Sequence, residues 1–201
     1  MNKIVKDTIA LTLITLVAGI LLGFVYEITK EPIAIQQEAG KQAAYQEVFQ
    51  DASTFETVIE GADPSLQDFL TEVGYAQQTI NKALKAMDKD GEVLGYVFTV
   101  TSKEGYGGDI TLVMGVRMDG TTNGYSILSI NETPGLGMKA DSSEFKSQFQ
   151  NINVQQFEYT KTGATSDGEI DVISGATITT NAVVNGVNAG LHAFTYLEGG
   201  H

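Results

Sequence analysis

The chain contains no cysteine. Without a thiol it can form no disulfide, hold no iron–sulfur cluster or thiolate-bound metal, use no Cys nucleophile and carry no lipid on an N-terminal Cys. Basic residues are also few, with 12 Lys and Arg against 25 Asp and Glu and a net charge of −13. Because a polyanion partner requires a basic face, this composition argues against binding to nucleic acid.

Histidine is scarce as well. His192 lies in a stretch with helical periodicity, and His201 is the last residue of the sequence. The sequence shows no Ser-His-Asp set, zinc motif, Walker loop or dinucleotide-binding fingerprint. Most of the carboxylates are expected to solvate the surface. We therefore predict neither a catalytic residue nor a metal ligand in this chain.

One long hydrophobic run stands near the N-terminus. Thr8 to Tyr26 holds no charged residue and is rich in Leu, Ile, Val and Ala. At about 1.5 Å per residue its length matches the hydrocarbon core of a bilayer. A cleaved signal peptide is the alternative, but the run is longer than a typical signal core, and residues 23–26 offer no A-x-A-like cleavage site. The run predicts a single transmembrane anchor.

Charges that flank this run predict its orientation. Lys3 and Lys6 precede it, whereas Lys30 on the far side stands between Glu27 and Glu31. The positive-inside rule then places the N-terminus in the cytoplasm and the chain from about residue 30 outside it. We expect a single-pass protein of the cell membrane, in contact with lipid, with an extracytoplasmic domain.

Two segments lie between the anchor and the predicted sheet. Pro32 follows the anchor, and apolar residues at helical spacing predict an amphipathic helix from Ile33 to Phe49. Residues 51–81 show no clean period and receive no assignment. The expected divisions are 1–29 for the N-terminus and anchor, 30–82 for a helical connecting region, and 83–201 for the main domain.

From Ala83 the pattern becomes that of a β-sheet. Largely apolar runs extend from Ala83 to Met87, Val93 to Thr101, Ile110 to Met118 and Tyr125 to Ile130, separated by turns rich in Gly and Asp. Short connections favour antiparallel pairing. The sequence predicts an α+β fold, with a mainly antiparallel sheet and flanking helices.

Further elements follow the sheet. A capping-box spacing at residues 141–144 predicts a short helix that buries Phe145 and Phe149. A short strand is expected from Ile170 to Ile173. After Thr177, an apolar stripe at helical spacing predicts a final helix on the core.

The stretch before this final helix is Asp171-Val172-Ile173-Ser174-Gly175-Ala176-Thr177. Gly175 and Ala176 allow another group to approach the backbone, and the N–H groups that open a helix can bind a phosphate. Ser and Thr also cap helices without any ligand, with Ser174 as the expected cap. The residues alone leave both interpretations open.

A similar string occurs earlier, as Thr162-Gly163-Ala164-Thr165. Ser166-Asp167-Gly168 follows it and predicts a loop rather than a helix. A phosphate there would find fewer aligned N–H donors. Position therefore favours the later string, Ser174 to Thr177, as the phosphate site.

Residues 131–137 form a distinct loop between the sheet and the short helix. Pro134 restricts one backbone angle, and Gly135 and Gly137 permit unusual ones with little side-chain bulk. The loop is either a plain turn or one wall of a binding site.

These stretches together resemble a known family. Asp171-x-x-Ser174-Gly175-Ala176-Thr177 is similar to the flavinylation motif of the FMN-binding domain, which is found in the G subunit of Rnf (Rsx) electron transport complexes and in the C subunit of sodium-translocating NADH:quinone reductases. Glu132 to Gly137 and Gly105-Tyr106-x-Gly108-x-Ile110 match further loops of the family. With the anchor and the helix that follows Pro32, the resemblance covers nearly the whole chain.

The resemblance implies FMN held by a phosphoester bond to Thr177, made by a separate flavin transferase that uses FAD. Asp171 either serves recognition by the transferase or its metal, or only shapes the turn. The other expected cofactor-binding residues are Glu132, Thr133, Gly135, Leu136 and Gly137, along the flavin or its ribityl chain, and Ser174, Gly175 and Ala176, beside the attachment point.

The implied function is electron transfer within an Rnf-type complex that couples ferredoxin and NAD to sodium or proton transport. This chain alone would only carry electrons, with the other proteins of the complex as its partners. Three alternatives remain: the C subunit of the quinone reductase, which is usually longer; an anchored assembly or binding module that carries no flavin; and a stand-alone extracellular flavoprotein.

Overall fold

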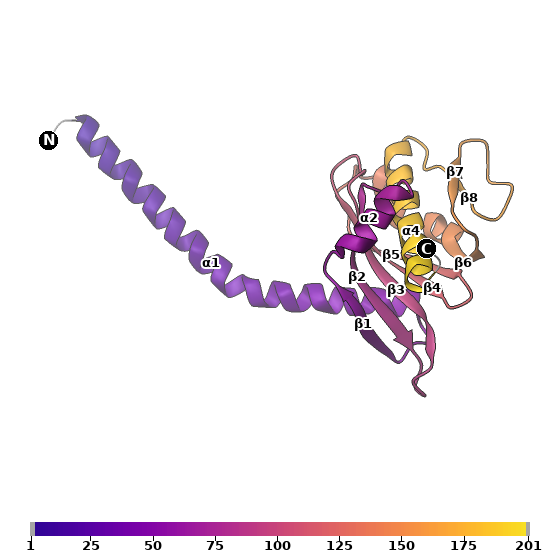
Figure 1. Ribbon diagram of the computed structural model, residues 1–201. Helices are drawn as coiled ribbons and strands as arrows, with labels where there is room; N and C mark the ends of the chain where they lie inside the picture. Colours follow the sequence, from indigo (N-terminus) through magenta and orange to yellow (C-terminus); the bar gives the residue numbers. More distant parts are fainter. Residues whose placement is uncertain (1–2, 200–201) are drawn as a thin grey trace. The chain divides into compact units, whose positions relative to one another are not determined.

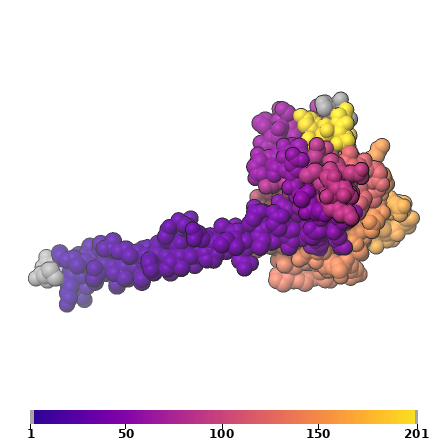
Figure 2. All heavy atoms as spheres, turned by 90° about the horizontal axis from the view of Figure 1, so that it is seen from below, coloured from indigo at the N-terminus to yellow at the C-terminus, as the bar shows by residue number. Residues whose placement is uncertain are grey.

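The computed structural model describes residues 3–199, which divide into two compact units between Lys41 and Gln42. Helix α1 (Lys3–Val48) makes up the described part of the first unit (Figure 1, Figure 2). Its last residues, 42–48, belong to the second unit. The helix is long and apolar enough to cross a membrane, and no part of its apolar window is buried within the protein. This exposure is typical of a membrane anchor and not of the core helix of a soluble domain.

Pro32 lies inside α1 and does not end it, so the two helical segments expected from the sequence are one helix. A proline removes a single backbone hydrogen bond and crowds the preceding turn, which bends a long helix more often than it stops it when both flanks favour helix.

The second unit is built on a six-stranded sheet in which each strand pairs antiparallel with the next (Figure 1). The strands are β1 (Thr54–Glu60), β2 (Gln78–Met87), β3 (Val93–Ser102), β4 (Ile110–Arg117), β5 (Thr121–Ser129) and β6 (Gln150–Asn153). A small parallel pair joins β7 (Glu158–Thr160) to β8 (Glu169–Asp171). The predicted α+β fold with a mainly antiparallel sheet is confirmed.

Helix α4 (Thr177–Leu197) lies on one face of this sheet and covers the main core. Two glycines on its inner side allow the close approach. A Cβ on Gly190 would overlap Met114 of β4, and one on Gly186 would lie 3.2 Å from Leu112 Cδ2. The helix therefore packs its backbone directly against the side chains of β4.

The opposite face of the sheet carries a second apolar cluster around the end of α1. Tyr45, Val48 and Phe49 pack there with Val97 and Val113 from β3 and β4. Residues 42–48 are therefore part of the globular unit, which explains the unit boundary near residue 41.

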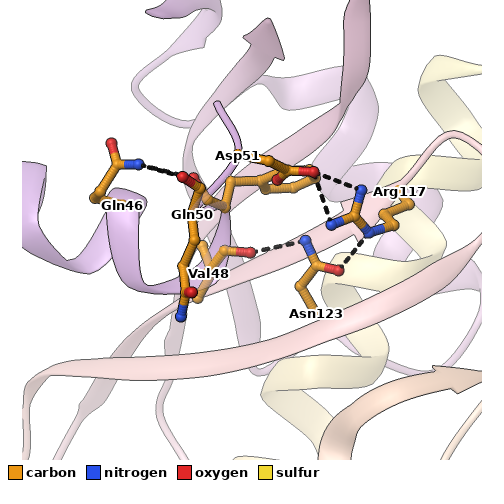
Figure 3. A network of polar contacts seen from close by, with 7 residues as sticks. Gln46, Val48, Gln50, Asp51, Arg117 and Asn123 are labelled. Carbon is orange, nitrogen blue, oxygen red and sulfur yellow. Dashed lines mark hydrogen bonds and ion pairs between the residues drawn. The ribbon is translucent and has the colours of Figure 1, made fainter. Parts of the chain in front are cut away.

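The sole arginine fixes this helix end to the sheet (Figure 3). Arg117 donates to Asp51 Oδ2 at 3.0 and 3.1 Å and to Asn123 Oδ1 at 2.9 Å, and its guanidinium lies 5.5 Å from the centre of the Phe49 ring. Asn123 in turn donates to the Val48 carbonyl at 2.8 Å. The polar contacts set the direction of the helix end, while the apolar cluster supplies most of the stabilisation.

Residues 51–81, which the sequence leaves unassigned inside a helical connecting region, form β1, α2 (Pro64–Glu72) and the start of β2. The difference has a physical cause. β1 is an edge strand that exposes most of its side chains, so its residues show no alternating apolar pattern.

The segment between β5 and β6 is divided into three helical pieces in place of the one short helix expected. It consists of the 3₁₀ turn η1 (Gly137–Asp141), α3 (Ser143–Lys146) and the 3₁₀ turn η2 (Ser147–Phe149). Ser142, and not Asp141, caps α3 by accepting from Phe145 N at 3.3 Å. Phe145 and Phe149 are buried, as expected.

Candidate functional site

The start of α4 is the centre of the candidate site. Ala176 occupies the cap position without a side-chain cap hydrogen bond, so the prediction of Ser174 as the cap is wrong. Thr180 orders the turn from inside instead, since its hydroxyl accepts from Ile173 N and donates to Ala176 O, each at 3.0 Å. Because the Ala176 side chain cannot accept a hydrogen bond, the N–H groups that open the helix at Thr177 are left for another acceptor.

Gly175 turns the chain toward the loop at residues 131–137. Its φ of +78° lies in the left-handed region, where glycine is favoured, and a Cβ there would lie 3.1 Å from Leu136 Cδ2. The turn before α4 and the loop that the sequence singles out are therefore direct neighbours.

A cleft of about 490 Å³ opens where these two segments meet. Its size is within the usual range of pockets for small molecules and cofactors. The lining residues are Tyr106, Glu132, Thr133, Leu136, Gly137, Gly175, Ala176, Thr177, Ile178 and Thr179. Seven of the predicted site residues thus line one cleft, among them Thr177, the first residue of α4.

Three predicted residues do not line this cleft. Gly135 is exposed in its loop with φ +78°. Ser174 and Asp171 line a separate, smaller cleft of about 180 Å³. Asp171 Oδ1 accepts from Ala164 N at 2.6 Å. Asp171 therefore holds the loop that precedes β8, a contact that fits the turn-shaping role left open by the sequence.

Three residues of the cleft escape the sequence-based prediction. Tyr106 is 71% exposed and Ile178 is 52% exposed, so both present apolar surface at the cleft, whereas Thr179 is 1% exposed and lies in its wall. Tyr106 belongs to a stretch that matches the family, which is the signal that could have identified it. For Ile178 the signal is its direct proximity to Thr177.

The loop at residues 105–108 is fastened to the loop at 131–137 through Glu132. Gly107 N donates to Glu132 Oε1 at 3.2 Å, and Asn131 Nδ2 donates to Gly107 O at 3.3 Å. A Cβ on Gly107 would overlap the Asn131 carbonyl oxygen. The glycine therefore permits the contact that brings Tyr106 to the cleft.

Thr165, in the earlier Gly-Ala-Thr string, has a different environment. Its N–H and its hydroxyl both donate to Glu169 Oε2, at 2.7 and 3.0 Å. These hydrogen bonds lower the pKa of Glu169. Thr165 is exposed in a loop outside the cleft. Of these two threonines, Thr177 is the one that lies both at the start of a helix and in the lining of the cleft.

Titratable groups do not gather at this cleft into a metal site. Among residues 3–199, no group of three or more His, Asp and Glu side chains could hold a metal ion. His192 lies on α4 between the rings of Phe69 and Tyr75, with centroid distances of 6.4 and 5.0 Å. Burial there lowers the pKa of His192.

Two known families match parts of this chain. The FMN-binding domain family matches residues 105–192, and the RnfG N-terminal region matches residues 1–48. The first match includes both loops and the start of α4, and the second covers α1.

Three similar proteins are G subunits of ion-translocating complexes. The one from the proton-translocating ferredoxin:NAD(+) oxidoreductase complex of Clostridium ljungdahlii is 34% identical over 99% of this chain and 96% of its own. The one from the ion-translocating oxidoreductase complex of Methanosarcina acetivorans is 30% identical over 98% of both chains. The one from the Na(+)-translocating ferredoxin:NAD(+) oxidoreductase complex of Acetobacterium woodii is 30% identical over 96% of this chain and 92% of its own.

Among solved structures, the C subunit of the Na(+)-translocating NADH-quinone reductase of Parabacteroides distasonis is 23% identical over 75% of this chain and 78% of its own, with a TM-score of 0.48. The full-length relatives are the stronger finding, because they match the anchor and the globular unit together. The chain belongs to the RnfG family, the G subunits of Rnf ion-translocating oxidoreductase complexes.

Proposed function

We propose that this protein is the FMN-carrying electron-transfer component of a membrane Rnf-type ferredoxin:NAD oxidoreductase complex, and that Thr177 carries the FMN through a phosphoester bond. Family membership and the FMN-binding domain support the electron-transfer role. The observation that carries the attachment site is that Thr177 lies at the uncapped start of α4 and in the wall of the cleft.

The cleft fits FMN in its chemistry. Tyr106, Leu136 and Ile178 present exposed apolar surface beside it, which suits a flat aromatic ring system. Glu132 and Thr179 supply polar groups in its wall. FMN, when bound, contributes the redox chemistry, and the residues of the cleft hold it in place and shield it from water.

The start of α4 suits the phosphate. Uncapped N–H groups and the helix dipole favour a negative charge there by about 0.3–1 kcal/mol. This is too little to retain a cofactor by itself, which favours a covalent tether. In the attachment step the transferase joins Thr177 Oγ to the FMN phosphoryl group of FAD. The phosphoanhydride bond of FAD breaks, AMP leaves, and the hydroxyl proton is lost.

The orientation of the chain is a further part of the proposal. Lys3 and Lys6 before the apolar run favour a cytoplasmic N-terminus and an extracytoplasmic FMN domain. Because the chain has no native cysteine, single Asp7→Cys and Asp167→Cys variants can be labelled in intact cells with a membrane-impermeant maleimide. Labelling of Asp167→Cys alone is expected, and labelling of Asp7→Cys alone would reverse the orientation.

Flavin attachment is tested by co-expression of the exported chain with a flavin transferase. Fluorescence of its band under ultraviolet light on a denaturing gel reports covalent flavin. We expect the signal from the wild type and from Thr165→Ala but not from Thr177→Ala. Loss of the signal in Thr165→Ala alone would contradict the assignment, and absence of the signal from all three would favour an unmodified assembly module.

Membership of the complex is tested by gentle purification of the anchored protein. Other membrane proteins of the complex should accompany it, because its relatives are named as subunits of such complexes. Recovery of the chain alone would argue for a stand-alone flavoprotein.

A further inference from the structure

Thr179 is a buried polar residue that the fold of the chain does not use. It is 1% exposed and lines the cleft, yet no hydrogen bond joins its hydroxyl to any group in residues 3–199. The next residue, Thr180, is equally buried but uses its hydroxyl twice in the turn before α4. Among the described residues, Thr99 Oγ1 is the side-chain oxygen that is both fully buried and without a partner. The Thr179 hydroxyl is instead open to the cleft, where a bound ligand can reach it and supply a hydrogen bond.

Glu132 presents a second unused oxygen to the same place. The side chain is 7% exposed, and its Oε1 accepts from Gly107 N. No group in the described part of the chain donates to Oε2. A Cβ on Gly137 would lie 2.6 Å from Glu132 Oε2 and 2.7 Å from Thr179 Oγ1, so the two oxygens flank a single point beside Gly137.

The chemistry of this pair defines what it can bind. An ionised carboxylate only accepts hydrogen bonds, whereas a hydroxyl both donates and accepts. The pair therefore suits a ligand with adjacent hydroxyl groups. One ligand hydroxyl can donate to the Glu132 carboxylate, and its neighbour can donate to or accept from the Thr179 hydroxyl. A phosphate, which offers only acceptors when ionised, would be repelled by the carboxylate.

We propose that Glu132, Gly137 and Thr179 form a polyol seat that binds the hydroxyls of the FMN ribityl chain. This inference rests on the proposed attachment of FMN to Thr177. Thr179 follows Thr177 by two residues, about 3 Å along the helix axis. In FMN the hydroxyl-bearing carbons follow directly after the phosphate, so they are the groups within reach of Thr179, while the polar edge of the ring lies at the far end of the cofactor.

The absence of a side chain at residue 137 keeps the seat open. Gly137 is not in the left-handed region of backbone space, so conformation alone does not demand glycine there. Space does, because any Cβ would fill the point that the two oxygens flank. The same geometry brings Glu132 and Gly137, from one loop, together with Thr179 of α4.

The test uses the full chain with FMN attached, and compares Thr179→Val, Thr179→Ser and Glu132→Gln with the wild type. Glu144→Gln is the control, since Glu144 is exposed and lines the other cleft. Time-resolved fluorescence anisotropy reports rotation of the flavin relative to the protein, and iodide quenching reports its exposure. Infrared bands of the ring carbonyls report hydrogen bonds to the ring.

We expect Thr179→Val and Glu132→Gln to raise the freely rotating fraction and the iodide quenching constant roughly 2- to 10-fold, the effect of one lost hydrogen bond. Thr179→Ser and Glu144→Gln should match the wild type, and the ring carbonyl bands should not move. The melting temperature of flavin-free Thr179→Val should equal or exceed that of the wild type, because the hydroxyl has no partner among the described residues.

Flavin that is attached but held equally firmly in Thr179→Val would overturn the inference while leaving the attachment to Thr177 intact. Shifted ring carbonyl bands would place the seat at the ring and overturn its assignment to the ribityl chain. Absence of attached flavin from the wild type would instead be a failure of the proposed function.

Discussion

Gly107 N–H donates to Glu132 Oε1 at 3.2 Å and so joins the loop that follows β3 to the loop that follows β5. The bond fixes one carboxylate oxygen and leaves the other at the cleft. A negative charge is thereby held beside the proposed flavin site, in a residue that is only 7% exposed. This charge is expected to lower the midpoint potential of a flavin bound in the cleft.

The first prediction concerns the midpoint potential of the attached flavin. Replacement of Glu132 by Gln keeps the size of the side chain and removes its charge, so addition of electrons to the flavin becomes easier and the potential rises. At an effective dielectric constant of about 20 and separations of roughly 6–15 Å, the change is on the order of 1–3 kcal/mol per electron. Spectroelectrochemical titration measures it, and a potential that moves equally in Glu144→Gln would show that the effect is not specific to Glu132.

The second prediction concerns the space beside Gly137. A Cβ in Gly137→Ala would lie 2.6 Å from Glu132 Oε2 and 2.7 Å from Thr179 Oγ1, which is too close for either contact. We expect a loss of about 1–3 kcal/mol in the free energy of unfolding, measured by urea denaturation, together with a looser flavin. Gly135→Asn serves as the control, because the space around Gly135 is open and asparagine tolerates its φ of +78°. Equal stability of Gly137→Ala and the wild type would show that the loop can yield.

A third prediction concerns the contact between α4 and β4. A Cβ in Gly190→Ala would overlap Met114 Sδ, whereas one in Gly186→Ala would lie 3.2 Å from Leu112 Cδ2. Gly190→Ala should therefore lower the free energy of unfolding by about 1–3 kcal/mol, and by more than Gly186→Ala does. The double variant Gly190→Ala with Met114→Ala should recover part of the loss, and no recovery would contradict a steric origin.

The fourth prediction is a pH dependence that arises from His192. Burial lowers the pKa of His192, so the unfolded chain binds a proton more readily than the folded one. Its contribution to stability is therefore complete above the unfolded pKa, near 6.5, and is lost as the pH falls from there through the folded value. In a His201→Gln background, urea titrations from pH 7.5 to 5 should show this decline, and His192→Phe should remove it. A decline of equal size in His192→Phe would assign it to carboxylates.

The sequence predicts well those elements whose side chains carry a regular pattern. The strands from Val93 and Ile110 are buried on both faces, and their apolar runs match β3 and β4 within one residue. β1 could not be predicted in this way, because an edge strand with exposed side chains owes its place to pairing with β2. Pro32 predicts a boundary between two helices, but α1 continues through it because helix-forming residues stand on both sides.

The residues of the candidate site also differ in how well the sequence predicts them. The motif around Thr177 and the loop at Glu132 stand out in the sequence because glycine and proline mark shaped backbone. Thr179 carries no such mark and is identified only from its place in the wall of the cleft. Ser174 has the right residue type for a cap, yet the cap position falls at Ala176 because Thr180 orders the turn from within.

The most direct test of the account locates the flavin on one residue. Trypsin cannot do so, since no Lys or Arg follows Lys161 and one peptide would contain both Thr165 and Thr177. Cleavage after glutamate separates them at Glu169, and tandem mass spectrometry of the flavin-loaded protein then reads the site. We predict the FMN phosphoryl mass on Thr177, in the peptide that begins at Ile170; the same mass on Thr165, or on Ser174, would contradict the account.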